Sequence, residues 1–308
     1  MTYVFFYDSL TWPEVHTLPH DTPLVLPLGK GYPLEQLTSV LDNPPRVGLL
    51  PSFPFGWEGS SLHMPEALLR AYLTNLLDGL RDEGFSRLYT LTPPGIALGS
   101  ATKQLSLPPS FPLLGKEEER LGDKVVLLPI GHTEQHGYHL PLSTDTVIVD
   151  DIAQGVVEAI PAQAVRLPVM PYGVSMHRSA FAGTMNAGGR AFEDFWVGVI
   201  DVLIARGFDR FYFLNGHGGN GSFLVNVVKY AGERHPHAFC ATAFLYLSGP
   251  PGIAALEKHR RSPIGGMGHA CELETSLMLH LRPDTVHMER VVDEMDFIST
   301  PNYYMDWI

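Results

Sequence analysis

One short stretch of this sequence carries an unusual concentration of imidazole and carboxylate groups. Residues 131–145 read GHTEQHGYHLPLSTD and contain three candidate metal ligands: Glu134, His136 and Asp145. A second loop, NGHGGN at 215–220, places His217 between glycines. Imidazole and carboxylate ligands together suit zinc, manganese or iron(II). The two stretches therefore predict a divalent-metal centre and, with it, a metal-dependent hydrolase.

The spacing of these residues favours a shared site. In an extended segment Glu134 and His136, two positions apart, point to the same side and can face one ion. Asp145 falls at or near the start of a predicted helix, where the helix dipole favours a carboxylate. Its two oxygens could bridge two cations. The alternative is a set of ordinary polar loop residues, but two such loops, each after a predicted strand, favour the metal centre.

Other polar residues near the loops have two interpretations each. Glu272 and Glu274 enter an apolar helix, where a buried carboxylate is costly unless it is paired or metal-bound. Each is therefore a candidate ligand or a helix cap. His132 is expected to be structural, and His139 to pack or to form a hydrogen bond behind the ligands. Cys271 is expected to be a buried, unreactive thiol.

Apolar runs that alternate with helical patterns predict an α/β fold, a parallel sheet flanked by helices in three layers. Strands are predicted at 125–130, 164–170, 211–214 and 239–247. Helices are predicted at 144–160, 192–206, 223–233 and 272–281. Both candidate metal loops then follow strand ends, at the sheet edge where open α/β proteins bind ligands.

The N-terminal part repeats signals of the later part. GFSRLYTL at 84–91 matches GFDRFYFL at 207–214 in five of eight positions. Two shorter matches precede it in the same order: LPLG at 26–29 with LPIG at 128–131, and PFG at 54–56 with PYG at 171–173. The common order predicts an internal duplication. Residues 1–115 would form a degenerate α/β repeat, and residues 120–308 the metal-binding catalytic domain.

The first repeat lacks the chemistry of the second. Lys30, Gly31 and Tyr32 stand where the second repeat has its first histidine, a threonine and Glu134. We therefore expect the first repeat to give structural support, rather than to wall the pocket or replace an oligomer contact. Residues 105–112, with three prolines in five positions, are predicted to connect the repeats.

Charge and composition exclude several classes of function. The formal net charge is −12 and no basic cluster occurs, which argues against a nucleic-acid partner. No apolar run reaches the roughly 20 residues of a membrane helix, and the N-terminus lacks the features of a signal peptide. Two cysteines without a Cys-x-x-Cys pair indicate no disulfide framework, so a reducing cytoplasm is the expected location.

Four motifs in order resemble the creatininase (creatinine amidohydrolase) family: LPIGHTEQHG with HLP and TD at 128–145, YGVSMH and FAGT at 172–184, NGHGGN at 215–220, and HACELETS at 269–276. The resemblance covers about residues 120–290. It implies a parallel sheet layered by helices, and a homo-oligomer. It also implies two divalent ions, zinc, manganese or iron, in which Glu134 and His217 hold one metal, His136 holds the other and Asp145 bridges them.

The sequence departs from the family at two places. Creatininases carry a tyrosine and a glutamate after the motif histidine, where this chain has Gly218 and Gly219. The glutamate is a metal ligand, so another residue must replace it: Glu272 is the first candidate and Glu274 the second. Glycines 265 and 266 stand where creatininases have a tryptophan and an aspartate that contact creatinine, so creatinine is not the expected substrate.

The expected reaction is hydrolysis of an amide, cyclic amide or formamide C–N bond in a small molecule, with metal-activated water. His269 is the candidate acid for the leaving nitrogen, as the resemblance also implies, and Glu274 could carry the proton instead. Ser175, His177 and Gly218 are expected to line the substrate pocket. Two alternatives stay open: hydrolysis of a cyclic ketone or lactone, and metal or ligand binding without catalysis.

Overall fold

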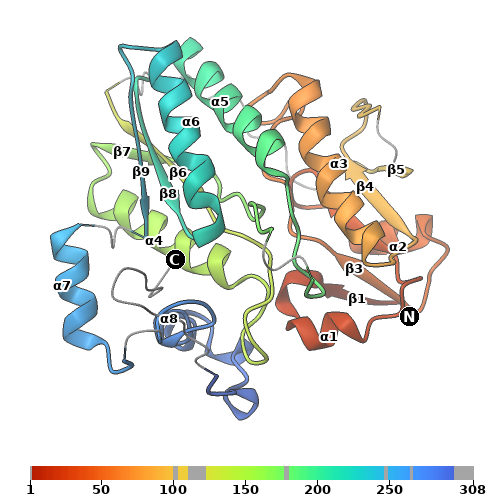
Figure 1. Ribbon diagram of the computed structural model, residues 1–308. Helices are drawn as coiled ribbons and strands as arrows, with labels where there is room; N and C mark the ends of the chain where they lie inside the picture. Colours follow the sequence, from red (N-terminus) through yellow and green to blue (C-terminus); the bar gives the residue numbers. More distant parts are fainter. Residues whose placement is uncertain are drawn as a thin grey trace.

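The computed structural model describes residues 2–99, 103–109, 123–176, 180–245, 249–263 and 266–294. Two parallel sheets lie one after the other along the chain, with helices packed on their faces (Figure 1). This confirms the predicted α/β class of parallel sheets flanked by helices. Within the described ranges, no helix combines the length and the apolar character needed to cross a membrane.

The first sheet is built from residues before 107. Its strands, in chain order, are β1 (Tyr3–Phe6), β2 (Leu24–Pro27), β3 (Arg46–Leu49), β4 (Leu88–Thr92) and β5 (Lys103–Ser106). The spatial order is β1-β3-β2-β4-β5. Its helices are η1 (Tyr7–Ser9), α1 (Trp12–His16), α2 (Leu34–Val40) and α3 (Glu66–Asp82). Because β5 runs to Ser106, the predicted connector at 105–112 begins later than expected, just before Pro108 and Pro109.

The second sheet contains the strands predicted from the apolar runs after residue 124. They are β6 (Val125–Ile130), β7 (Ala164–Arg166), β8 (Arg210–Asn215) and β9 (Phe239–Phe244), in the order β7-β6-β8-β9. β7 is shorter than the predicted 164–170, because Pro168 cannot donate to a ladder. The chain rejoins the sheet only at an isolated pairing of Met170 with Ile130.

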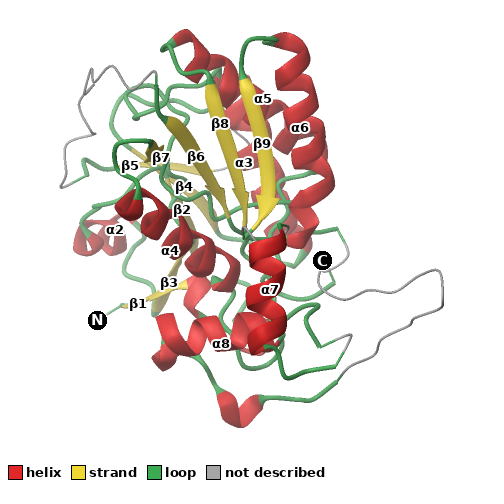
Figure 2. Ribbon diagram, turned by 90° about the vertical axis from the view of Figure 1, so that its left-hand side faces the viewer, coloured by secondary structure: helices red, strands yellow, loops and turns green. Residues whose placement is uncertain are grey.

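Helices cover both faces of the second sheet (Figure 2). The helices of this half of the chain are α4 (Thr144–Ala159), α5 (Gly189–Ala205), η2 (Gly218–Asn220), α6 (Gly221–Arg234), α7 (Pro250–His259), α8 (Glu272–Leu281), η3 (Pro283–Thr285) and η4 (Met288–Arg290). Alternate residues of β8 point to opposite faces. Phe211 and Phe213 join the core under α5 and α6, whereas Leu214 joins the core under α4 and α8.

The central strands of the two sheets pair in the same register. The equivalent pairs are Pro27 with Leu91 in the first sheet and Pro129 with Leu214 in the second. The carbonyl of each of these prolines accepts a hydrogen bond from a residue further along the chain, Phe53 at 2.8 Å and Met170 at 3.0 Å. These are the positions that the predicted repeat aligns, so the register supports the duplication, which stays a prediction.

The two sheets share one hydrophobic core. Helix α3 packs beside α5 (Figure 1), and the ring centroids of Tyr72 and Phe195 lie 5.0 Å apart. Phe53 lies 5.8 Å from Phe195, and the Tyr72 hydroxyl donates to the Tyr172 carbonyl at 2.8 Å. The N-terminal half is therefore packed against the second sheet through buried aromatic side chains.

Replacing Phe195 by alanine tests this shared core. Phe195 is fully buried, so Phe195→Ala should lower the free energy of unfolding by about 3–5 kcal/mol through lost contacts and a cavity. The matched control is Phe239→Ala, a ring that is 63% exposed, which should change it by less than about 1 kcal/mol. Urea unfolding measures both, and equal shifts in the two variants would contradict the shared core.

Candidate metal centre

The loops after β6 and β8 meet the starts of α4 and α8 in one buried cluster. His217 Nδ1 lies 3.1 Å from Glu134 Oε1 and 3.1 Å from Asp145 Oδ2. His136 Nε2 lies 3.0 Å from Asp145 Oδ1 and 3.8 Å from Glu274 Oε1. All five side chains are buried. The structure thus brings four predicted ligands together and adds Glu274 to them.

Backbone carbonyls fix the tautomers of two histidines. His136 Nδ1 lies 3.1 Å from the Glu134 carbonyl oxygen, and His217 Nε2 lies 3.1 Å from that of Val174. His269 Nε2 lies 2.7 Å from the Gln135 carbonyl oxygen but also 2.9 Å from the Gln135 side-chain amide nitrogen, so these contacts select no tautomer for it. For His136 and His217 the carbonyl only accepts, so that nitrogen donates. The other ring nitrogen then presents a lone pair toward the carboxylates, which is the arrangement of metal-bound histidines.

Two buried carboxylate oxygens support a cation at this place. Glu134 Oε1 and Asp145 Oδ2 have no hydrogen-bond partner among the described residues. Both face His217 Nδ1, which presents a lone pair of its own when the ring is neutral. Acceptors that face one another are unfavourable unless a proton or a metal cation lies between them. The residues therefore fit a divalent metal.

Without metal, the carboxylates hold protons on the imidazoles. Burial alone would lower the pKa values of His136 and His217, but the carboxylates of Asp145 and Glu134 outweigh it and raise each pKa to about 10. Burial would raise the pKa of Asp145, yet the neighbouring imidazoles lower it to about 2. Burial raises the pKa of Glu274. The cluster therefore attracts positive charge, as protons or as metal.

The ligand atoms form three overlapping sets, each within 4.8 Å: His132, Glu134 and His217; Glu134, His136 and His269; His136, Asp145 and Glu274. His132 differs from the other histidines of these sets. Its Nδ1 accepts a hydrogen bond from Gly173 N at 2.9 Å, so its Nε2 carries the hydrogen. Burial lowers its pKa to about 3, and the ring stays neutral. His132 is thus placed as a donor beside the site.

Two other polar residues support the ligands. The Ser175 hydroxyl donates to Glu134 Oε2 at 2.8 Å and is fully buried. Ser175 was expected to line the pocket, but this contact places it behind the carboxylate. His139 Nε2 lies 2.9 Å from the Thr275 hydroxyl, and this contact joins the metal loop to α8.

Two further residues were predicted to line the substrate pocket. Gly218 begins η2 and is half-buried, whereas His177 lies outside the described residues.

The structure corrects the order of the two glutamate candidates. Glu272 accepts hydrogen bonds from the backbone N–H groups of Arg261 (2.9 Å) and Ser262 (2.7 Å), outside the cluster. Residues two apart on a helix do not share a face, so only Glu274 points at His136. Glu274 also accepts from Cys271 N at 3.1 Å. Glu274 therefore both caps the helix and faces the site.

Gly219 shows why a glutamate is absent from the His217 loop. A Cβ at this position would lie 2.4 Å from both His217 Nε2 and the Val174 carbonyl oxygen. Any side chain would therefore break the hydrogen bond that orients His217. Glu274 approaches the cluster from the opposite element, α8, and supplies a carboxylate that the loop cannot carry.

Comparison with known proteins agrees with this geometry. The profile of a family described as creatinine amidohydrolase (Creatininase) matches residues 115–307. The chain belongs to the creatininase family. A solved structure titled "Creatininase Mn" matches with a TM-score of 0.52 and 28% identity, over 58% of this chain and 74% of that one. Residues before 115 lie outside the family match.

Curated creatininase-family relatives carry different activities in their names. The mycofactocin precursor peptide peptidase of Mycolicibacterium smegmatis is 35% identical over 175 residues, which are 54% of this chain and 62% of that protein. The creatinine amidohydrolase of Pseudomonas putida is 30% identical over 56% of this chain and 70% of its own length. The 3-dehydro-scyllo-inosose hydrolase of Thermotoga maritima is 29% identical over 55% of this chain and 54% of its own length.

Metal binding should release protons. His136 and His217 hold protons up to a pKa of about 10 in the metal-free protein, so a metal must displace them. The affinity for zinc should therefore rise as pH increases from 6 to 9. Calorimetric titration of chelator-treated protein, in two buffers of different ionisation enthalpy, measures the protons released. An affinity that is flat across this range would contradict the assignment.

Proposed function

We propose that this chain is a metal-dependent hydrolase that cleaves a C–N bond. The observation that carries the proposal is the pair His136 and His217, each holding one N–H on a backbone carbonyl and turning its other nitrogen toward buried carboxylates. The names of two relatives give further support, because a creatinine amidohydrolase and a peptide peptidase both act on C–N bonds.

Each ligand has a distinct role in this proposal. Glu134 and His217 would hold one divalent cation, His136 and Glu274 a second. Asp145 would contact both, since its Oδ2 faces His217 and its Oδ1 faces His136. Zinc, manganese or iron would suit these ligands. Such cations supply Lewis-acid chemistry, in that they activate water and polarise a scissile carbonyl.

His269 is proposed to move the proton. Its side chain is 19% exposed, more than the other clustered residues, and its Nδ1 lies 3.6 Å from Glu134 Oε1. Gln135 contacts the opposite nitrogen through both its carbonyl oxygen and its side-chain amide, so Nδ1 is the atom proposed to exchange a proton with solvent or substrate. An imidazole at this position can take a proton from water and deliver it to the leaving nitrogen.

The substrate is proposed to be a small amide, cyclic amide, formamide or peptide bond. Hydrolysis of a cyclic ketone is the second candidate, because one relative is named a 3-dehydro-scyllo-inosose hydrolase. A binding role without catalysis is less consistent with the site, since Glu274 supplies the carboxylate missing at Gly219. Turnover of matched amide and cyclic-ketone panels by the metal-loaded protein separates these alternatives.

We also propose that this chain forms a homo-oligomer, as the family resemblance implies. Light scattering of the purified protein tests this proposal.

Metal content and activity together test this assignment. Glu274→Gln should lose about one equivalent of metal, whereas the control Glu272→Gln should keep the wild-type content, because Glu272 accepts hydrogen bonds from Arg261 and Ser262, outside the cluster. His136→Ala should abolish hydrolysis. His269→Asn should keep the metal and lower kcat by about 10²–10⁴-fold. Elemental analysis measures the metal. Equal losses in the two glutamate variants would refute the role of Glu274.

A further inference from the structure

Three aromatic rings meet beside the loop that carries His136. Trp12, the first residue of α1, lies with its ring centroid 5.4 Å from that of Tyr138 and 5.5 Å from that of Phe181. Tyr138 is 43% exposed and Phe181 37% exposed, so both rings keep faces open to solvent. Exposed aromatic surface beside a buried polar centre is typical of a ligand contact.

Two of the rings stand on loops that carry the metal site. Tyr138 follows His136 by two positions, and the intervening Gly137 packs against Ala270, the neighbour of His269. Phe181 lies three residues before Thr184, whose hydroxyl accepts a hydrogen bond from Gln135 N, next to Glu134, at 3.3 Å. Trp12 therefore bridges the two loops from outside.

Main-chain and side-chain contacts hold Trp12 in place. Just before it, the carbonyls of Asp8 and Leu10 accept hydrogen bonds from Ser143 N (3.0 Å) and Leu142 N (2.9 Å). Just after it, Glu14 closes a capping box with Thr11 and pairs with Arg290 at 3.3 Å. A ring held this firmly loses little freedom when it contacts a ligand.

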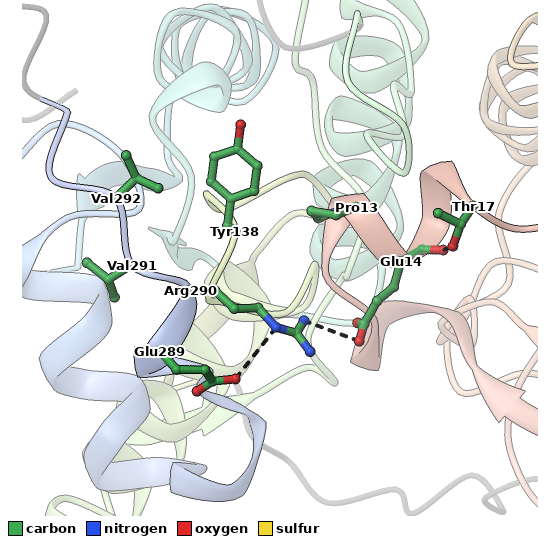
Figure 3. A pocket seen from close by; sticks show the side chains of 8 residues that line it. All are labelled: Pro13, Glu14, Thr17, Tyr138, Glu289, Arg290, Val291 and Val292. Carbon is green, nitrogen blue, oxygen red and sulfur yellow. Dashed lines mark hydrogen bonds and ion pairs between the residues drawn. The ribbon is translucent and has the colours of Figure 1, made fainter.

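A groove of about 550 Å³ continues from Tyr138 between α1 and η4 (Figure 3). Its walls include Pro13, Val291 and Val292. The guanidinium of Arg290 extends between Glu14 and Glu289, as the dashed lines in Figure 3 show, so its charge is already compensated within the groove. Of the three rings only Tyr138 lines the groove, which joins apolar surface to the polar side chains of Glu14, Glu289 and Arg290.

We propose that Trp12, with Tyr138 and Phe181, forms a specificity subsite for a large apolar, preferably aromatic, group attached to the scissile bond. The inference rests on the proposed hydrolase function and adds a substrate class to it. Trp12 lies before the family match at 115–307, whereas Tyr138 and Phe181 lie inside it, so the N-terminal half completes a subsite that the family domain begins. It would give this chain a preference distinct from that of its relatives.

Equilibrium binding of two hydroxamates tests the subsite without turnover. Hydroxamates bind metal, and phenylalanine hydroxamate differs from alanine hydroxamate only in its ring. The metal-loaded full chain should bind the phenylalanine compound about tenfold more tightly. Trp12→Ala should remove this preference and leave the affinity for alanine hydroxamate unchanged. Trp12→Phe should restore most of the preference, and Phe181→Ala should reduce it.

The control is Tyr230→Ala, an exposed ring on α6, which should leave both affinities unchanged. No preference in the wild-type chain, or a preference that survives Trp12→Ala, would overturn the subsite. Equal weakening of both compounds by Trp12→Ala would also overturn it, because it would show a purely structural role. If neither compound binds the wild-type chain, the metal-centre proposal fails, and the subsite falls with it.

Discussion

The structure depends on holding three carboxylates and several imidazoles together away from water. Buried carboxylates are unfavourable unless donors or cations compensate them. The backbone meets part of this demand, since carbonyls of Glu134, Val174 and Gln135 orient the imidazoles. Side chains meet another part, as when Ser175 donates to Glu134. The oxygens that remain without donors define where a cation belongs.

The parallel sheet makes this concentration of charge possible. Parallel strands end at one edge, so the loops after β6 and β8 meet there without long detours. Residues Val126 to Ile130 pair continuously with Phe211 to Asn215, which fixes the distance between the two loops. Helix α8 then brings Glu274 from the opposite side. Rigid strands and helices thus position ligands that flexible loops alone would not hold.

Much of this arrangement could be predicted from the sequence, because apolar runs define strands and strand ends define the ligand edge. Glu134, His136, Asp145 and His217 converge for that reason. The choice between Glu272 and Glu274 could not be predicted. It depends on how α8 is rotated against α4, which tertiary packing sets. The carbonyls that orient the histidines could not be predicted either, since every residue carries one. The predicted strand 164–170 was too long because its apolar pattern continues past Pro168, which cannot donate to the ladder.

The peptide groups of one leucine tie the N-terminal half to the chemistry. Leu142 donates its N–H to the Leu10 carbonyl and accepts, at its own carbonyl, the N–H of Glu134. A metal-binding carboxylate is thus two hydrogen bonds away from the segment that leads into α1. Evolutionary loss or redesign of the N-terminal half would therefore also change the backbone support of Glu134 in the C-terminal half.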